Sequence, residues 1–294
     1  MGGLSKSLRA LFTEFGFRPD KALGQNFLRD ERLLPRILAA AEISPDDTII
    51  EVGAGFGVLT RALAERARRV VAVEVDRRLI PILEHRLSDL TNVKLVHADV
   101  LSISPVALLA PESPPYYKVV ANLPYYITSP TLRHFLESEQ KPTRMVVMLQ
   151  REVAERIIAK PGDMSLLAVS VQFYARPKII AHISRHSFYP PPEVDSALVR
   201  LDLYETPPYD VPEPGIFFDI VRAGFGQRRK QLRNSLARGL GLTTEQVVKL
   251  LNNCGINPTH RAEDLSLDEW ACLSRALVKR CRANGDPVRH SRPQ

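Results

Sequence analysis

Residues 48–60, which read TIIEVGAGFGVLT, decide the fold of this chain. Residues 48–52 are mostly β-branched and predict a short buried strand. The pattern at 58–67 predicts a helix. Three glycines stand at alternate positions between them: Gly53, Gly55 and Gly57. Because glycines let the backbone turn sharply and approach a ligand, and the helix N-terminus presents its amides there, this segment predicts a ligand-binding loop.

The same alternation of strand and helix continues through the first two-thirds of the chain. Further strands are predicted at 70–74, 93–97, 119–123 and 145–149, with helices at 76–87 and 129–138. Two more strands, at 178–183 and 197–204, are expected to pair as an antiparallel hairpin at one edge. This order predicts an α/β fold, a Rossmann-like, mostly parallel sheet with helices on both faces.

Beyond the proline-rich stretch 206–215, which predicts a linker, only helical patterns occur. They lie at 216–225, 230–238, 244–252 and 267–283. Thr243 or Thr244 suits a helix start, and Ser266 with Glu269 has the spacing of a capping box. We expect an α/β domain at 1–208 and a small C-terminal all-helical domain at 209–294, divided near 205 to 213.

The composition is that of an ordinary globular protein, with 45% hydrophobic and 25% charged residues in 294. The apolar runs are too short to cross a membrane, and no signal-peptide core follows the N-terminus. We therefore expect a cytoplasmic protein with no membrane contact. Cys254, Cys272 and Cys281 form no CxxC pair, and the seven histidines lack metal-ligand spacing. Reduced thiols and no metal site are expected.

The net charge of +7, with a pI near 9.4, favours a polyanionic partner. The segment 222–240 holds no acidic residue and six basic ones: Arg222, Arg228, Arg229, Lys230, Arg233 and Arg238. Its apolar residues fit one helix face, which leaves the basic ones outward: Phe225, Leu232, Leu236 and Leu240. The concentration favours RNA binding, with a solvated helix face as the alternative.

Acidic residues accompany the glycine loop and the next strands. Glu74 comes 21 residues after Gly53, where a carboxylate can accept both hydroxyl protons of a ribose. A dinucleotide-binding loop would have its third glycine at the position of Val58. Glu51 would repel a pyrophosphate but suits the amino group of methionine, and Asp99 can accept from an adenine amine. The set predicts S-adenosylmethionine rather than NAD, held by the glycine loop, Glu74 and Asp99.

The fourth strand ends in the sequence NLPY, residues 122–125. The exocyclic amine of adenine is a poor nucleophile because its lone pair is delocalised into the ring. Two acceptors, the side-chain oxygen of Asn122 and the carbonyl of Leu123, would draw this nitrogen towards a tetrahedral shape and free the lone pair. Pro124 fixes the turn, and Tyr125 offers a ring on which an extruded base can stack. The motif predicts N6 methylation by orientation and electrostatics, without a strong general base.

Together with further motifs, these residues make the chain resemble the rRNA adenine N6,N6-dimethyltransferases. The further motifs are LGQNFL at 23–28, EVD at 74–76, QREVAER at 150–156, FYPPPEVDS at 188–196 and QRRKQLRNSL at 227–236. Within the family, the chain is most similar to the bacterial branch that dimethylates two adjacent adenines near the 3′ end of small-subunit (16S) rRNA. The resemblance extends from residue 21 to residue 274.

The resemblance implies an N-terminal arm, residues 1–30, that folds over the cofactor. It also implies an aromatic, Phe188, beside the target base, with core packing as the alternative for this residue. It implies cofactor contacts from Asn26, the Leu28 backbone, Gly53, Glu74, Asp99 and Asn122. The helical domain would help to hold the rRNA. The partner implied is small-subunit rRNA within an assembling 30S particle, bound by a monomer.

Three other functions remain open. A resistance enzyme that methylates one adenine of large-subunit rRNA tends to carry Ile where Leu123 stands and Asn where Asp195 stands. A DNA adenine methyltransferase would prefer Pro at position 123. A non-catalytic ribosome-assembly factor would keep the fold and bind RNA without methylating it, and the intact Asn122 and Tyr125 argue against such a loss.

Overall fold

The computed structural model describes residues 8–112, 114–227 and 229–284, and the chain divides into two compact units. The α/β unit consists of Met1–Ala154 and Ala175–Glu205. The helical unit consists of Glu155–Tyr174 and Thr206–Gln294. The second segment of the helical unit starts at the proline-rich stretch. Its first segment, Glu155–Tyr174, is inserted between two parts of the α/β unit. The ring of Phe173 explains this grouping, because its centroid lies 4.6 Å from that of Phe217 in the helical core.

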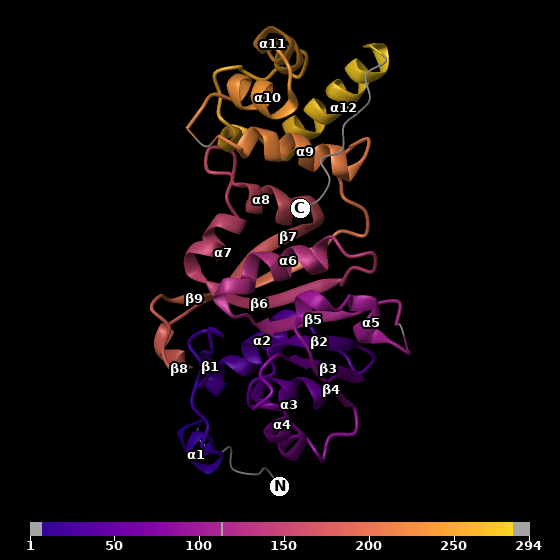
Figure 1. Ribbon diagram of the computed structural model, residues 1–294. Helices are drawn as coiled ribbons and strands as arrows, with labels where there is room; N and C mark the ends of the chain where they lie inside the picture. The colour runs from indigo at the N-terminus through magenta and orange to yellow at the C-terminus, as the bar shows by residue number, and fades with distance from the viewer. Residues whose placement is uncertain (1–7, 113, 228, 285–294) are drawn as a thin grey trace. The chain divides into compact units, whose positions relative to one another are not determined.

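The α/β unit is built on a seven-stranded sheet in the order β4-β3-β2-β5-β6-β9-β7 (Figure 1). The strands are β2 (Thr48–Val52), β3 (Arg69–Glu74), β4 (Val93–His97), β5 (Lys118–Asn122), β6 (Arg144–Gln150), β7 (Ala175–Ile183) and β9 (Ser196–Leu203). Strands β2 to β6 run parallel, and β9 is antiparallel to both β6 and β7. All seven predicted strands are present, and the antiparallel pair at the edge is confirmed.

The helices of this unit bury apolar residues against the sheet. They are α1 (Leu8–Glu14), α2 (Leu34–Ala41), α3 (Val58–Ala64), α4 (Ile80–Arg86), α5 (Pro105–Leu109) and α6 (Thr128–Leu136), and α7 (Arg151–Ile157) crosses into the helical unit. Ile37 of α2 and Leu63 of α3 lie in one cluster with Ile49 of the sheet. A second cluster contains α4 and packed rings from Phe17, Phe27 and Phe56. The N-terminal arm is thus tied to the body by aromatic packing.

A two-residue antiparallel pair joins the arm to the segment before β9. In it, β1 (Phe27–Leu28) lies against β8 (Phe188–Tyr189). Leu28 is opposite Phe188, and Phe27 is opposite Tyr189. The sequence did not predict this pair because two residues are too few to show a strand pattern.

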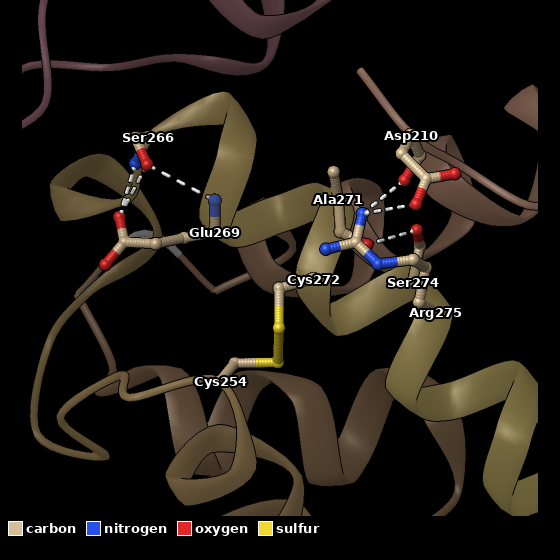
Figure 2. Close-up of a disulfide and its surroundings, with 8 residues drawn as sticks. All are labelled: Asp210, Cys254, Ser266, Glu269, Ala271, Cys272, Ser274 and Arg275. Atoms are coloured by element: carbon tan, nitrogen blue, oxygen red, sulfur yellow. Dashed lines mark hydrogen bonds and ion pairs between the residues drawn. A yellow bond between two sulfur atoms is a disulfide. The ribbon is translucent and has the colours of Figure 1, made fainter.

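The helical unit contains α8 (Leu166–Tyr174), α9 (Pro214–Phe225), α10 (Leu232–Leu240), α11 (Thr244–Asn253) and α12 (Leu267–Asn284). The fully buried Trp270 lies over Gly224, where an added Cβ would be 2.4 Å from the ring, so glycine lets α9 approach α12 closely. Capping boxes form at Thr243 and at Ser266, whose amide donates to the Glu269 carboxylate (Figure 2). The predicted helix starts are confirmed.

Cys254 and Cys272 form a disulfide between the end of α11 and α12 (Figure 2). The prediction of reduced thiols is therefore wrong for this pair, whereas Cys281 is free and buried. The two cysteines are 18 residues apart in sequence, and the fold brings their Cα atoms to 5.8 Å, within the range of a disulfide. No local motif could reveal such a pair.

Candidate active site

A cavity lies at the carboxyl ends of β2, β3 and β5, where an open α/β sheet binds its ligand. It is lined by the arm, the glycine loop, the ends of the strands and the turn after β5. Eight of the predicted site residues line it together: Asn26, Gly53, Gly55, Glu74, Asp99, Asn122, Leu123 and Tyr125. Gly53 has a φ of 78°, a left-handed conformation that favours glycine, and its α-carbon faces the Asn122 carbonyl.

Leu28 and Phe188 do not line this cavity. Phe188 is 2% exposed and lies with Leu28 in the hydrophobic cluster that also contains Ile49 of the sheet. The β1–β8 pairing turns both side chains into the interior. In this conformation Phe188 supports the arm rather than offering a ring to a base, which differs from the contact implied by the family resemblance.

Glu74 is the last residue of β3, and its carboxylate accepts two backbone hydrogen bonds. One oxygen accepts from the amide of Gly55 at 2.9 Å, and the other accepts from the amide of Asp76 at 2.9 Å. Burial raises the pKa of Glu74, and these two amide bonds oppose the rise. A carboxylate has about four acceptor positions, so two remain for ribose hydroxyls. The glycine loop and Glu74, the predicted ribose acceptor, are therefore locked to each other.

Glu51 lies behind the loop, away from the larger cavity. Its side chain is 1% exposed, and neither carboxyl oxygen has a hydrogen-bond partner among the described residues. Burial, with the charge of Glu74 as a lesser cause, raises the pKa of Glu51 to about 8. It borders a small cavity of about 40 Å³, shared with Gly53 and Asn122, which has room for water. The predicted contact with a methionine amine would have to cross this cavity.

The orientation of the Asn122 amide is set by the arm. The Asn122 Nδ2 donates to the carbonyl of Asn26 at 2.8 Å. A carbonyl only accepts, so the nitrogen end of the amide faces the arm and Oδ1 is left as the acceptor for a ligand. This is the polarity that an adenine amine requires, because that amine donates.

The Tyr125 ring is held at its hydroxyl, which is 2.7 Å from the hydroxyl of Ser196. Ser196 is the buried first residue of β9, and Asp195 beside it accepts from the amide of Arg185. Burial raises the pKa of Tyr125, so the hydroxyl stays protonated and available for this bond. Ser196 was not predicted, although it ends the motif at 188–196.

Two further residues border the cavity without having been predicted. Tyr126 is 57% exposed and lies against the arm at Gly24, whose added Cβ would be 3.1 Å from the ring. Gln25 of the arm donates to the Asp76 carboxylate at 2.7 Å. Asp99 was predicted, and one of its oxygens accepts from the amide of Leu101. The other oxygen can accept from an adenine amine.

The basic run of the helical unit has the predicted facing, except that Arg233 is half-buried. Leu232 and Leu236 are buried, whereas Arg229, Lys230 and Arg238 are exposed. Arg222 of the same run forms an ion pair with Asp219, with 2.6 Å between the charged atoms. Arg228 lies outside the described residues.

Across the described ranges, no group of three or more His, Cys, Asp or Glu could hold a metal ion. In the same ranges, no helix is long and apolar enough to cross a membrane. The cavity instead offers carboxylates, amide groups and aromatic rings. These groups can bind an adenosine through its ribose and amine, and can orient a second amine without proton transfer by a strong base.

The family model of ribosomal RNA adenine dimethylases matches residues 16–279. A ribosomal RNA small subunit methyltransferase A of Dehalococcoides mccartyi is 47% identical over 270 residues, which cover 92% of each chain. The protein of that name from Geobacillus kaustophilus is 46% identical over 278 residues, covering 92% of this chain and 94% of its own.

Solved structures show the same architecture. A dimethyladenosine transferase from Plasmodium falciparum superposes with a TM-score of 0.72 at 22% identity, covering 88% of this chain and 98% of its own. The 23S rRNA methyltransferase ErmE superposes with a TM-score of 0.66 at 30% identity, covering 86% of this chain and 100% of its own. The Plasmodium falciparum structure shows the fold, a class I methyltransferase sheet followed by helices.

Proposed function

Because the chain belongs to the ribosomal RNA adenine dimethylase family, we propose that it methylates two adjacent adenines near the 3′ end of small-subunit rRNA. The reaction transfers methyl groups from S-adenosylmethionine to N6 and yields N6,N6-dimethyladenosine. The protein is an S-adenosylmethionine-dependent rRNA adenine dimethyltransferase with a role in small-subunit biogenesis.

The observation that carries this function is the orientation of the Asn122 amide. Its nitrogen is engaged by the Asn26 carbonyl, so its oxygen is the acceptor at the end of β5. Together with the Leu123 carbonyl, this oxygen would accept both hydrogens of an adenine N6 and direct the nitrogen lone pair outward. Donor groups at this point would instead repel the amine.

The cavity fits the cofactor by its set of acceptors. Glu74 keeps lone pairs for two ribose hydroxyls, and Asp99 keeps one oxygen for the adenine amine. When bound, S-adenosylmethionine supplies an electrophilic methyl group. The buried Glu51 behind the loop would meet the methionine end of the cofactor through the small cavity.

Stacking on Tyr125 would hold the target base. The bond to Ser196 anchors the far end of the ring, so its face stays in the cavity. A base stacked on an aromatic ring gains about 1–3 kcal/mol. The hydroxyl needs no role in proton transfer, since the product amine can lose its proton to water.

The helical unit would provide the grip on rRNA. Arg229, Lys230 and Arg238 are exposed on one segment and can neutralise phosphates. The partner proposed is small-subunit rRNA within an assembling 30S particle in the cytoplasm, bound by a monomer.

The direct test is methylation of small subunits that lack the modification, with modified nucleotides mapped by mass spectrometry. Two dimethylated adjacent adenines near the 3′ end are expected, formed through a monomethyl intermediate. Methylation of large-subunit rRNA alone would indicate a resistance enzyme instead. Binding without any methylation would indicate a non-catalytic assembly factor.

A further inference from the structure

The arm is fastened to the body at a point next to the ribose acceptor. The Gln25 side chain donates to the Asp76 carboxylate at 2.7 Å and accepts from the amide of Asp20 at 2.8 Å. The amide of Asp76 in turn donates to the Glu74 carboxylate. One glutamine side chain therefore connects the arm's own turn to the loop that ends β3.

The next residue of the arm fixes the acceptor of the target amine. An asparagine amide has a donor end and an acceptor end of nearly equal shape, and a half-turn about its terminal bond exchanges them. The Asn26 carbonyl favours the orientation in which Asn122 Nδ2 faces the arm. If the arm moved away, both orientations would become accessible, and in one of them an N–H would face the donor amine of adenine.

A third contact sets the distance of the arm from the turn after β5. Gly24 has a φ of 58°, and an added Cβ there would be 3.1 Å from the Tyr126 ring. The Asn26 side chain also donates to the Gly24 carbonyl at 3.0 Å, which keeps residues 24–26 as one compact turn. The position of the Asn26 carbonyl thus depends on both Gln25 and the glycine.

We propose that Gln25 is a positioning residue for methyl transfer. By holding the arm to Asp76 it keeps the Asn26 carbonyl where it orients Asn122, so that the acceptor orientation is favoured while the arm lies over the ribose side of the cavity. This inference rests on the proposed function. Two successive transfers need an exchange of cofactor between them, and the same fastening makes the site less active whenever the arm is open.

The test is the variant Gln25→Ala, compared with wild type in single-turnover methylation and in cofactor binding by calorimetry. Loss of one oriented group at a transition state lowers turnover about 100- to 1,000-fold. Because Gln25 acts through Asn122, we expect about a tenfold lower rate constant at saturating cofactor. The dissociation constant of S-adenosylmethionine should rise less than about threefold, because Glu74 and Asp99 keep their own bonds.

A readout without cofactor measures the arm itself. Hydrogen exchange of the Gln25 amide, which donates to the Asp20 carbonyl, should be faster in Gln25→Ala than in wild type. Arg32→Ala is the matched control, since Arg32 follows the arm, has a 91% exposed side chain and bonds to Asp30. It should leave both exchange and turnover unchanged.

Gly24→Ala is a second way to displace the arm. It removes no hydrogen bond, but its added Cβ would press on the Tyr126 ring. It should also slow the transfer more than it weakens cofactor binding, and the double variant should be little worse than either single one. Equal turnover in Gln25→Ala and wild type, or a loss confined to cofactor affinity, would overturn the positioning role. If wild type itself methylates no adenine while exchange shows a closed arm, the proposed function fails, and the inference fails with it.

Discussion

The α/β unit and the helical unit differ in what they bury. Three carboxyl side chains are buried among the described residues of the α/β unit: Glu51, Glu74 and Asp76. In the described part of the helical unit, the buried polar side chains are serines: Ser170, Ser235 and Ser274. Burying a charged group is costly unless it is paired or hydrogen-bonded, so such groups tend to be retained where chemistry needs them.

The helical unit places its charge on the outside. Its interior is apolar, with Phe173, Phe217 and Trp270 in one cluster, and a disulfide ties α11 to α12. Over its described residues, this interior offers stability and holds no buried carboxylate. In the proposed function, one unit would recognise the reacting atoms and the other would attach to the polyanion, and each role can be tested by a separate variant.

The largest effect is expected from Asn122→Ala. Removing the acceptor of the target amine should lower turnover at saturating cofactor by a hundredfold or more, the range seen when one oriented polar group at a transition state is lost. Cofactor binding should be weakened but measurable, because Glu74 and Asp99 remain. The measurement is methylation of small subunits together with cofactor titration.

Wild-type and Glu74→Ala proteins are the controls for this variant. Glu74→Ala should mainly raise the apparent cofactor KM, as expected when a group binds ground state and transition state alike. Near-normal turnover of Asn122→Ala would contradict the proposed mechanism, even if the family assignment stood.

The α/β architecture and the family could be predicted because they depend on local patterns. The β-branched run 48–52 and the glycines after it are contiguous in sequence, and the family predicted from ordered motifs is confirmed. Seven of the eight predicted residues meet at one cavity because the carboxyl ends of parallel strands share one edge, and the arm adds Asn26.

What could not be predicted depends on contacts between distant segments. The bond from Tyr125 to Ser196 joins residues 71 positions apart, and the one from Gln25 to Asp76 joins residues 51 apart. Phe188 was expected beside the base because it is aromatic and lies in a family motif. In the structure, the pairing of Phe188 with Leu28 turns its ring into the interior. The sequence could not predict this pairing, because a two-residue strand leaves no pattern in it.

The second effect concerns the disulfide. Cys254→Ser should lower the free energy of unfolding of the helical unit by about 3 kcal/mol, because the disulfide closes a loop between residues 18 positions apart. Thermal or urea unfolding under oxidising conditions measures it. Adding reductant should lower the stability of wild type to that of the variant and leave the variant unchanged. Cofactor binding, a property of the α/β unit, should not change. Insensitivity of wild type to reductant would mean that the thiols are unpaired in solution.

The third effect is a pH dependence confined to the α/β unit. The pKa of Glu51 is 4.5 ordinarily and about 8 in the folded protein, because burial disfavours its charged form. Between these values the folded protein holds a proton that the unfolded chain has lost. The stabilisation is therefore complete below pH 4.5 and is lost as the pH rises towards 8, by at most about 1.4 kcal/mol per pH unit.

Glu51→Gln removes this titration and keeps the size of the side chain. Its stability curve from pH 5 to 8 should be flatter than that of wild type, so the two should diverge in favour of the variant as the pH rises. Urea unfolding at several pH values gives both curves. Parallel curves would mean that Glu51 is ionised in the folded protein, with water in the small cavity bound to its charge.

The smallest effect concerns the helical unit and tests whether its exposed basic run binds RNA. RNA affinity should fall with salt by a log–log slope of about 0.7 to 0.9 per phosphate neutralised, depending on whether the strand is single or double. Replacing Arg229 and Lys230 with Gln should therefore flatten the slope by about 1.4 to 1.8 if each side chain contacts one phosphate. Exposed Lys249 and Lys279 lie in the same unit outside the run, so their double replacement with Gln matches the loss of charge. Equal slopes in the two double variants would mean that the run contributes only net charge, and that attachment to rRNA lies on another surface.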